Sequence, residues 1–345
     1  MPNEFPVRLT DLTATWLSEA LDYPIVSFTH TDIGAGKGML GDIFRLDLEL
    51  SDGSQKQLVT KFSADREETR AAAKRAGIFK REIDFYEQIA PVLKCRIPRC
   101  FGTWYDDETA EFLILMECID ADFSVNQIEG VTYDQAVLVM KELAALHVPA
   151  SQVADFRHLF SLVSAPERRA NQTLFITRGW EEIKKLVSPS LRTDFTADEM
   201  VKKLLGAFDH LSILPFYLLH GDARPDNLLF DRNGTSVALV DWQGVALGPR
   251  EWDIGYFLAQ GLTVEDRRAW TDDLLDIYVK EYGRYGEPPN RPEMARHIGK
   301  AAWFSFGVAC SLFTVADTSS QRTIDLAASM GERALNLLGD SGELL

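Results

Sequence analysis

The chain has few cysteines, and their spacing forms no recognisable pair. The 345 residues include only four, Cys95, Cys100, Cys118 and Cys310, and no two of them make a C-x-x-C motif. The absence of that spacing excludes a zinc-ribbon or a disulfide-stapled scaffold. We therefore expect reduced, mainly buried thiols, as in proteins of a reducing compartment.

The chain also lacks an excess of positive charge and a long apolar run. Its 36 Lys and Arg against 52 Asp and Glu give a formal net charge of -16, which disfavours nucleic acid and anionic membranes as partners. The longest uncharged stretch, residues 301–316, is shorter than a membrane span, so we expect a buried helix and no membrane insertion. No basic segment followed by an apolar core opens the chain, and we expect a cytoplasmic protein without a secretion signal.

The first third of the chain has the pattern of a small antiparallel sheet with helices. A helix over residues 10–21, capped by Thr10, precedes the strands. The turn at Ser51-Asp-Gly-Ser54 is a hairpin signal. A single long helix is expected at 65–89. The five predicted strands lie near residues 25–32, 42–50, 55–62, 99–105 and 111–116.

From Thr132 onward the periodicity is helical. Residues 133–147 form one amphipathic segment, and His147 at its end is expected to be a packed or capping residue rather than a catalytic one. Residues 150–215 and 262–340 continue the helical pattern. The sequence thus predicts an α+β, bilobal fold with a five-stranded lobe at 1–117 and a mainly helical lobe at 118–345.

A glycine-rich segment lies between the first two predicted strands. Gly34, Gly36 and Gly38 would let backbone N–H groups approach a phosphate closely. A surface hairpin also needs glycine, so both interpretations stay open with equal weight. Lys37 is followed by Gly38 rather than by Ser or Thr, which excludes a Walker A loop.

The third predicted strand carries Lys61, in the position where a kinase places its phosphate-binding lysine. An ion pair with a carboxylate of the following helix would hold this lysine in place. We predict Glu82 as its partner, with Asp84 and Glu87 as the competing carboxylates.

Residues 220–241 contain the strongest motif of the chain. His220-Gly-Asp222 is followed by Asn227, and the five-residue spacing from Asp222 to Asn227 is that of a kinase catalytic loop. Two short strands around the turn at 231–234 then lead to Asp241. We expect this hairpin to bring Asn227 and Asp241 to the same end, where their oxygens suit Mg²⁺ bound with phosphates.

These residues resemble the aminoglycoside phosphotransferase and choline kinase-like group of small-molecule kinases, which share the protein-kinase-like fold. The resemblance runs from the glycine-rich segment to about Leu258. It rests on the His220–Asn227 motif, on Val240-Asp-Trp-Gln243 and on Gly248-Pro-Arg-Glu-Trp-Asp253. The Asp-Trp-Gln sequence is similar to the ecdysteroid kinase-like branch in particular, which makes aminoglycosides less suited as natural substrates.

The resemblance implies an ATP- and Mg²⁺-dependent phosphotransferase that acts on the hydroxyl of a small molecule. Asp222 would orient that hydroxyl and take its proton, with His220 bracing the loop. Asn227 and Asp241 would hold Mg²⁺.

The nucleotide site follows from the same resemblance. Lys61, paired with Glu82, would contact the α- and β-phosphates. Backbone groups from Glu117 to Ile119 would bind the adenine edge. Asp253 would hold the catalytic loop from below by hydrogen bonds.

Two other functions compete with this one. A protein kinase needs an activation loop, and the 12 positions from Asp241 to Asp253 are too few for one. A silent nucleotide-binding module would be expected to lose at least one of the Lys, Asp, Asn and Asp residues, yet all are present. The acceptor stays open: an acidic pocket would suit an amine, and an aromatic one a lipid, a sterol or an acyl chain.

Overall fold

The structure is a computed structural model, and it describes residues 4–34, 41–122, 125–152, 159–316 and 318–344. Two compact units can be distinguished. The first contains most of the chain up to Asp120 together with Val240–Gly244. The second contains Ala121–Leu239 and Val245–Leu345, with the short segment Lys94–Arg96. The predicted lobe boundary between 117 and 118 stays a prediction.

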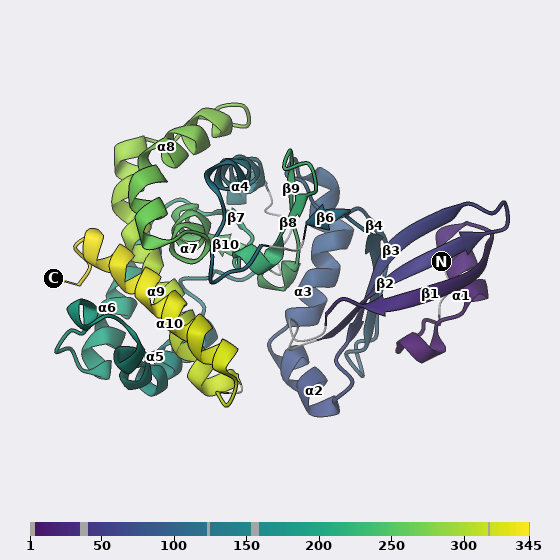
Figure 1. Ribbon diagram of the computed structural model, residues 1–345, viewed down its shortest axis with the longest axis horizontal. Helices are drawn as coiled ribbons and strands as arrows, with labels where there is room; N and C mark the ends of the chain where they lie inside the picture. Colours follow the sequence, from purple (N-terminus) through teal and green to yellow (C-terminus); the bar gives the residue numbers. More distant parts are fainter. Residues whose placement is uncertain (1–3, 35–40, 123–124, 153–158, 317, 345) are drawn as a thin grey trace. The chain divides into compact units, whose positions relative to one another are not determined.

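The first unit is built on a five-stranded antiparallel sheet in the order β1-β2-β3-β5-β4 (Figure 1). This confirms the predicted fold class. Neighbouring strands in the chain pair through short hairpins, and β3 and β5 pair across the longer helical connection. The strands are β1 (Ile25–Asp32), β2 (Gly41–Leu50), β3 (Gln55–Ser63), β4 (Cys100–Tyr105) and β5 (Phe112–Glu117).

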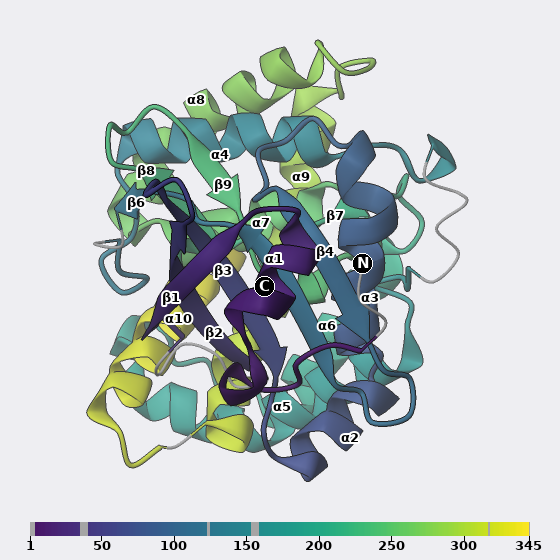
Figure 2. The same ribbon diagram turned by 90° about the vertical axis from the view of Figure 1, so that its right-hand side faces the viewer.

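One face of this sheet packs on the N-terminal helix α1 (Ala14–Leu21), which lies across it in Figure 2. Leu46 and Leu48 alternate with polar residues along β2 and are buried with Leu17 of α1, as the two-residue period of a strand requires. The predicted cap was wrong. Thr13 rather than Thr10 caps the helix, accepting a hydrogen bond of 3.1 Å from the Trp16 N–H.

The helix expected at 65–89 is divided into α2 (Glu67–Arg75), α3 (Ile78–Asp84) and a π-helical turn at Phe85–Ile89. The break falls at Gly77, whose φ of 63° is left-handed and cannot continue a right-handed helix. The hydrophobic periodicity runs through the break, which is why the sequence pattern did not reveal it.

The second unit is mainly helical. Its first helix, α4 (Tyr133–Leu146), begins at a capping box in which Thr132 and Gln135 satisfy each other's backbone N–H groups. This agrees with the predicted segment to within one residue. The other helices are α5 (Pro166–Leu186), α6 (Ala197–Leu211), α7 (Glu251–Gly261), α8 (Val264–Tyr282), α9 (Arg291–Val315) and α10 (Gln321–Asp340).

Helix α7 is the centre of this unit, since every one of its residues is buried. It packs against α9, and α5, α9 and α10 lie side by side (Figure 1). The backbone of α9 approaches closely at Gly255, where a Cβ atom would lie 2.8 Å from the Ile298 carbonyl oxygen. Side chains on α7 therefore have little freedom to move.

The predicted hairpin of the catalytic segment is present. Strands β8 (Leu228–Asp231) and β9 (Val237–Leu239) are antiparallel, with Leu228 paired to Leu239. The sequence pattern did not indicate β6 (Ala121–Asp122), which adds to β8. It also did not indicate the two-stranded pair β7 (Tyr217–Leu219) and β10 (Ala246–Gly248). Strands of two or three residues are too short for a periodic signal.

Among the described residues, α9 alone is long and apolar enough to span a membrane by composition. Its most apolar stretch is 67% buried within the described structure. The helix predicted at 301–316 matches the C-terminal part of α9, which ends one residue earlier, at Val315.

Candidate active site

The first group of predicted residues surrounds Lys61. Strand β3 is flanked by β2 and β5, where Lys61 pairs with Ile43 and Ile114. Its Nζ atom lies 2.8 Å from both carboxylate oxygens of Glu82. The competing carboxylates are engaged elsewhere: Asp84 pairs with Lys80, and Glu87 accepts a hydrogen bond from Thr103.

Asp241 completes this cluster. Its Oδ1 lies 3.1 Å from the Lys61 Nζ, so the ammonium sits between two carboxylates. Lys61 is buried, and burial by itself lowers the pKa of an ammonium, but the negative charges of Asp241 and Glu82 outweigh burial and raise the pKa of Lys61. Lys61 therefore stays charged, and a buried cation of this kind is suited to bind phosphate oxygens.

The backbone at Asp241 adopts a left-handed conformation with φ of 64°, uncommon for a residue other than glycine. Neighbouring contacts hold it there. The buried ring of Trp242 stacks on Phe85 at 3.9 Å, and Arg81 donates to the carbonyl oxygen of Gln243. A strained residue fixed by its surroundings is typical of a functional position.

The second group of predicted residues lies in the second unit, on the loop after β7. A 3-10 turn at Pro225–Asn227 returns Asn227 towards Asp222. The Nδ2 of Asn227 donates to the carbonyl oxygen and to Oδ2 of Asp222, both at 2.9 Å. The five positions from Asp222 to Asn227 therefore span the end of the loop and this one turn, which brings the Asn227 amide back to the Asp222 carboxylate. Gly221 has φ of 81°, which explains the glycine between His220 and Asp222.

Buried Asp253 holds this loop from α7, as predicted. Its carboxylate accepts the backbone N–H groups of His220 at 2.7 Å and Gly221 at 2.9 Å. His147 contacts the same carboxylate at 3.3 Å and the Tyr278 hydroxyl at 2.7 Å, so it is a packed residue, also as predicted. Burial lowers the pKa of His147, which keeps its imidazole neutral at pH 7.

Two direct partners of Asp222 were not predicted from the sequence. The Tyr256 hydroxyl donates to Oδ1 at 2.8 Å, and Arg224 Nε donates to Oδ2 at 3.3 Å. A signal for Tyr256 was available. It lies three residues after Asp253 on α7, and residues three apart share one helix face. The helix that holds the loop backbone therefore also holds the Asp222 side chain.

The remaining predicted residues belong to the first unit. Gly34 donates its N–H to Asp32 and to Ile43, whereas Gly36 and Gly38 lie outside the described residues. The Glu117 N–H donates to the Arg99 carbonyl oxygen at 2.8 Å at the end of β5. Ile119 follows in an irregular segment.

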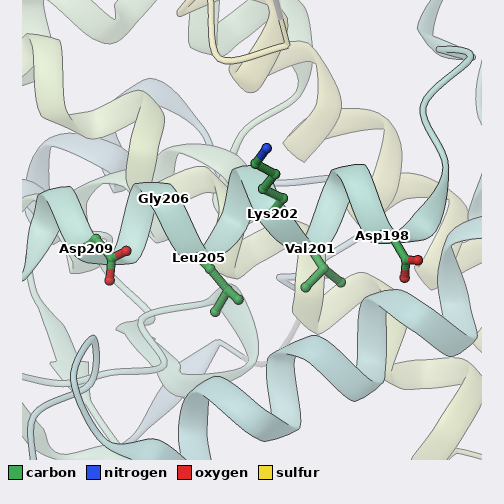
Figure 3. Close-up of a pocket in the computed structure, with 6 residues that line it drawn as sticks. All are labelled: Asp198, Val201, Lys202, Leu205, Gly206 and Asp209. Carbon is green, nitrogen blue, oxygen red and sulfur yellow. The ribbon is translucent and has the colours of Figure 1, made fainter.

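The described residues contain no cluster of three or more His, Cys, Asp or Glu side chains with metal-binding geometry. A pocket of about 560 Å³ lies along α6, and none of the predicted site residues lines it. Figure 3 shows Val201 and Leu205 on one side of the helix and Lys202 on the other. A pocket lined by a single surface helix has no convergent polar groups, so we do not assign the chemistry to it.

Known proteins are similar to this chain in sequence. A model of the ecdysteroid kinase-like family matches residues 35–285. An uncharacterised kinase-like protein of Caenorhabditis elegans is 21% identical over 276 residues, which cover 73% of this chain and 70% of that protein.

Many solved structures share the fold, and two of them serve as examples. One is a proposed aminoglycoside phosphotransferase from Ralstonia eutropha, with a TM-score of 0.61, 16% identity, and coverage of 95% of this chain and 97% of that one. The other is the GDP complex of wild-type aminoglycoside 2'-phosphotransferase-IIIa, with a TM-score of 0.53, 15% identity, and coverage of 96% and 98%. The family match covers most of the chain, and the predicted resemblance is confirmed: the chain belongs to the ecdysteroid kinase-like family.

Proposed function

We propose that this protein transfers the γ-phosphate of ATP, with Mg²⁺, to a hydroxyl group of a small molecule. The observation that carries the proposal is the Lys61 ammonium held between Glu82 and Asp241. A cation fixed in this way is preorganised for phosphate oxygens and needs no rearrangement when the nucleotide binds. The GDP bound in the aminoglycoside phosphotransferase supports nucleotide use by the fold.

The donor set fits Mg²⁺. Asn227 uses its amide nitrogen on Asp222, so the amide oxygen is the atom directed to other ligands, and Asp241 contributes a carboxylate. Asn227 directly precedes residues 228–239 of the hairpin and Asp241 follows them by two positions, and we propose on this sequence spacing that both serve one ion. Asn227 and Asp241 would hold the ion, which would supply positive charge to offset the negative charge of the phosphates.

Asp222 would orient the acceptor hydroxyl and accept its proton. A carboxylate has about four lone-pair sites. In the part of the chain that the structure describes, Asn227 and Arg224 donate to Oδ2 and Tyr256 donates to Oδ1. This leaves one site on Oδ1, where the hydroxyl would donate its proton, and the three partners fix the carboxylate in the orientation for that transfer.

The three hydrogen bonds to the Asp222 carboxylate also argue against the alternative of a silent nucleotide-binding module. A protein that only bound nucleotide would not need a carboxylate oriented by three hydrogen-bond donors. It would also not need Asp253 to hold the loop of that carboxylate from a buried helix. We therefore favour an active kinase. The protein-kinase alternative stays disfavoured by the short segment between Asp241 and Asp253.

The test is ADP release from MgATP with a panel of hydroxyl compounds, confirmed by phosphorus NMR of the product. Asp222→Asn should lower kcat by about a hundredfold or more, since it removes the group that takes the proton, and should leave MgATP binding nearly unchanged. Asp241→Ala should instead weaken MgATP binding, measured by calorimetry.

Two results would contradict the proposal. Full turnover by Asp222→Asn would reject the role of that carboxylate. MgATP binding by the wild-type protein with no turnover of any panel member would favour the silent module.

A further inference from the structure

Arg168 occupies an unusual position on the first turn of α5. Its guanidinium lies over two aromatic rings, 5.5 Å from the centroid of Phe160 and 5.7 Å from that of Phe304. Phe304 belongs to α9 and packs on the ring of Tyr256, the residue that donates to Asp222. Arg168 is thus part of the same aromatic surroundings as the proposed catalytic residue.

Within the described ranges, the guanidinium of Arg168 has no anionic partner. Over the described residues, it makes neither a hydrogen bond nor an ion pair, although it carries five N–H donors. The next residue, Arg169, is by contrast paired with Asp209. Unpaired arginines are ordinary at exposed positions such as Arg178 on the same helix, but Arg168 is half-buried. A cation in this environment has lost hydration without gaining a counter-ion.

Charge connects Arg168 to the catalytic loop. Burial lowers the pKa of Arg168, and the negative charge of Asp222 is the main influence opposing it. The two groups form no ion pair, so their charged atoms lie more than 4.0 Å apart. Asp222 is held instead by Arg224 and Asn227.

We propose that Arg168 binds an anionic group on the phosphate acceptor, so that the substrates are hydroxycarboxylates. This inference rests on the kinase function proposed above and names its substrate class. The hydroxyl would lie at Asp222, the carboxylate would accept two parallel hydrogen bonds from the planar guanidinium, and the Phe160 and Phe304 rings would contact the carbon chain between them.

The same geometry disfavours an amine. A cationic acceptor would place a second positive charge beside an unpaired guanidinium where water is partly excluded, and like charges repel strongly in such surroundings. Of the acceptor classes left open by the sequence, amines such as choline are therefore the least compatible with Arg168. A phosphorylated alcohol is also anionic, and an assay of both substrate types distinguishes it from a hydroxycarboxylate.

The experiment compares acids with their uncharged analogues. Hydroxycarboxylates of three to eight carbons, their methyl esters, glycerol 3-phosphate and choline are assayed for phosphorylation, and binding of the acids is measured by calorimetry with ADP and Mg²⁺ present. The proteins are wild type, Arg168→Gln and Arg168→Lys, with Arg178→Gln on the same helix as the matched control. Thermal unfolding checks that each variant folds.

For wild type we expect a KM for at least one acid about tenfold or more below that of its ester, the size of one charge-assisted hydrogen-bonded contact. Arg168→Gln should raise the KM and Kd for the acid by a similar factor and leave the ester within about twofold. Arg168→Lys should restore part of the affinity, since it keeps the charge without the planar fork. Arg178→Gln should match wild type. If Arg168→Gln fails to fold, the acid-to-ester ratios of wild type and Arg168→Lys decide.

Several results would overturn the inference without touching the kinase function. These are a preference for choline or for esters, a preference for glycerol 3-phosphate over every carboxylate, or an equal fall of kcat on acid and ester in Arg168→Gln, which would place Arg168 on the transferred phosphate. If no panel member is phosphorylated, the kinase proposal is in question, and calorimetry still decides the inference. The inference about Arg168 would be rejected if the acids bound the wild-type protein no more tightly than they bind Arg168→Gln.

Discussion

The two proposed reactive carboxylates, Asp241 and Asp222, differ in their partners far more than in their exposure. Their side chains are 39% and 33% exposed, so solvent access does not distinguish them. Asp241 faces the ammonium of Lys61 at 3.1 Å, whereas Asp222 accepts from an amide, a phenol and a guanidinium. The contacts of Asp241 bring full charges together, whereas the contacts of Asp222 fix the orientation of its carboxylate.

This difference indicates two kinds of chemistry. A cluster of full charges around a buried lysine suits the binding of highly charged phosphates, where electrostatic attraction dominates. A carboxylate oriented by three donors suits proton transfer, where the direction of the remaining lone pair matters. Removing one partner from each arrangement tests this difference.

Glu82→Gln should have the largest effect on stability. It removes one carboxylate from the buried Lys61, and breaking a buried pair typically costs several kcal/mol. Because Asp241 remains as a partner, we expect a loss of about 2–3 kcal/mol in the free energy of unfolding, together with weaker MgATP binding. Urea unfolding and calorimetry measure the two effects.

The matched control for this variant is Glu87→Gln. Glu87 is exposed and lies five residues further along the same segment, where its contact is the Thr103 hydroxyl. Its replacement should change stability by no more than about 0.5 kcal/mol. Equal losses for the two variants would show that the Lys61 pair has no special importance.

Tyr256→Phe should affect the second arrangement alone. It deletes the hydroxyl that donates to Asp222 and keeps the ring packed on Phe304. We expect kcat to fall about tenfold, the size of one hydrogen bond to a charged group, while the KM for ATP stays within about twofold.

Tyr285→Phe, at an exposed tyrosine, is the control and should leave both constants unchanged. A rise in the KM for ATP in Tyr256→Phe, with kcat intact, would contradict the orienting role of Tyr256.

The smallest expected effect is the pH dependence that His147 contributes. Burial lowers the pKa of His147, so the unfolded chain binds more protons than the folded one below the ordinary pKa of 6.5. The stabilisation is present above pH 6.5 and is lost as the pH falls, by up to about 1.4 kcal/mol per pH unit. Urea unfolding at pH 7.5 and 5.5 should show a smaller pH dependence for His147→Gln than for wild type.

His30→Gln is the control for this measurement, because His30 is exposed. It should retain the pH dependence of wild type. A His147→Gln protein with the wild-type pH dependence would show that other groups cause it.

Local signals explain why much of the architecture was predictable. Alternation in β2 and β3 and the turn between them define the hairpin that carries Lys61, because both are properties of adjacent residues. The His220–Asn227 motif was readable for the same reason, since a single loop and turn bring Asp222 and Asn227 together. The break at Gly77 was missed because the hydrophobic periodicity continues through it.

The sequence by itself determined the class of fold, the family and most side chains of the candidate site. Motifs and periodicity depend on neighbours in the chain, so they can be recognised without the tertiary structure. Only the tertiary structure decided which distant side chains share an environment. Tyr256 reaches Asp222 across 34 positions, and Arg168 lies against Phe304 of another helix. Such contacts depend on how buried helices pack, and packing is set by the shapes of many side chains at once.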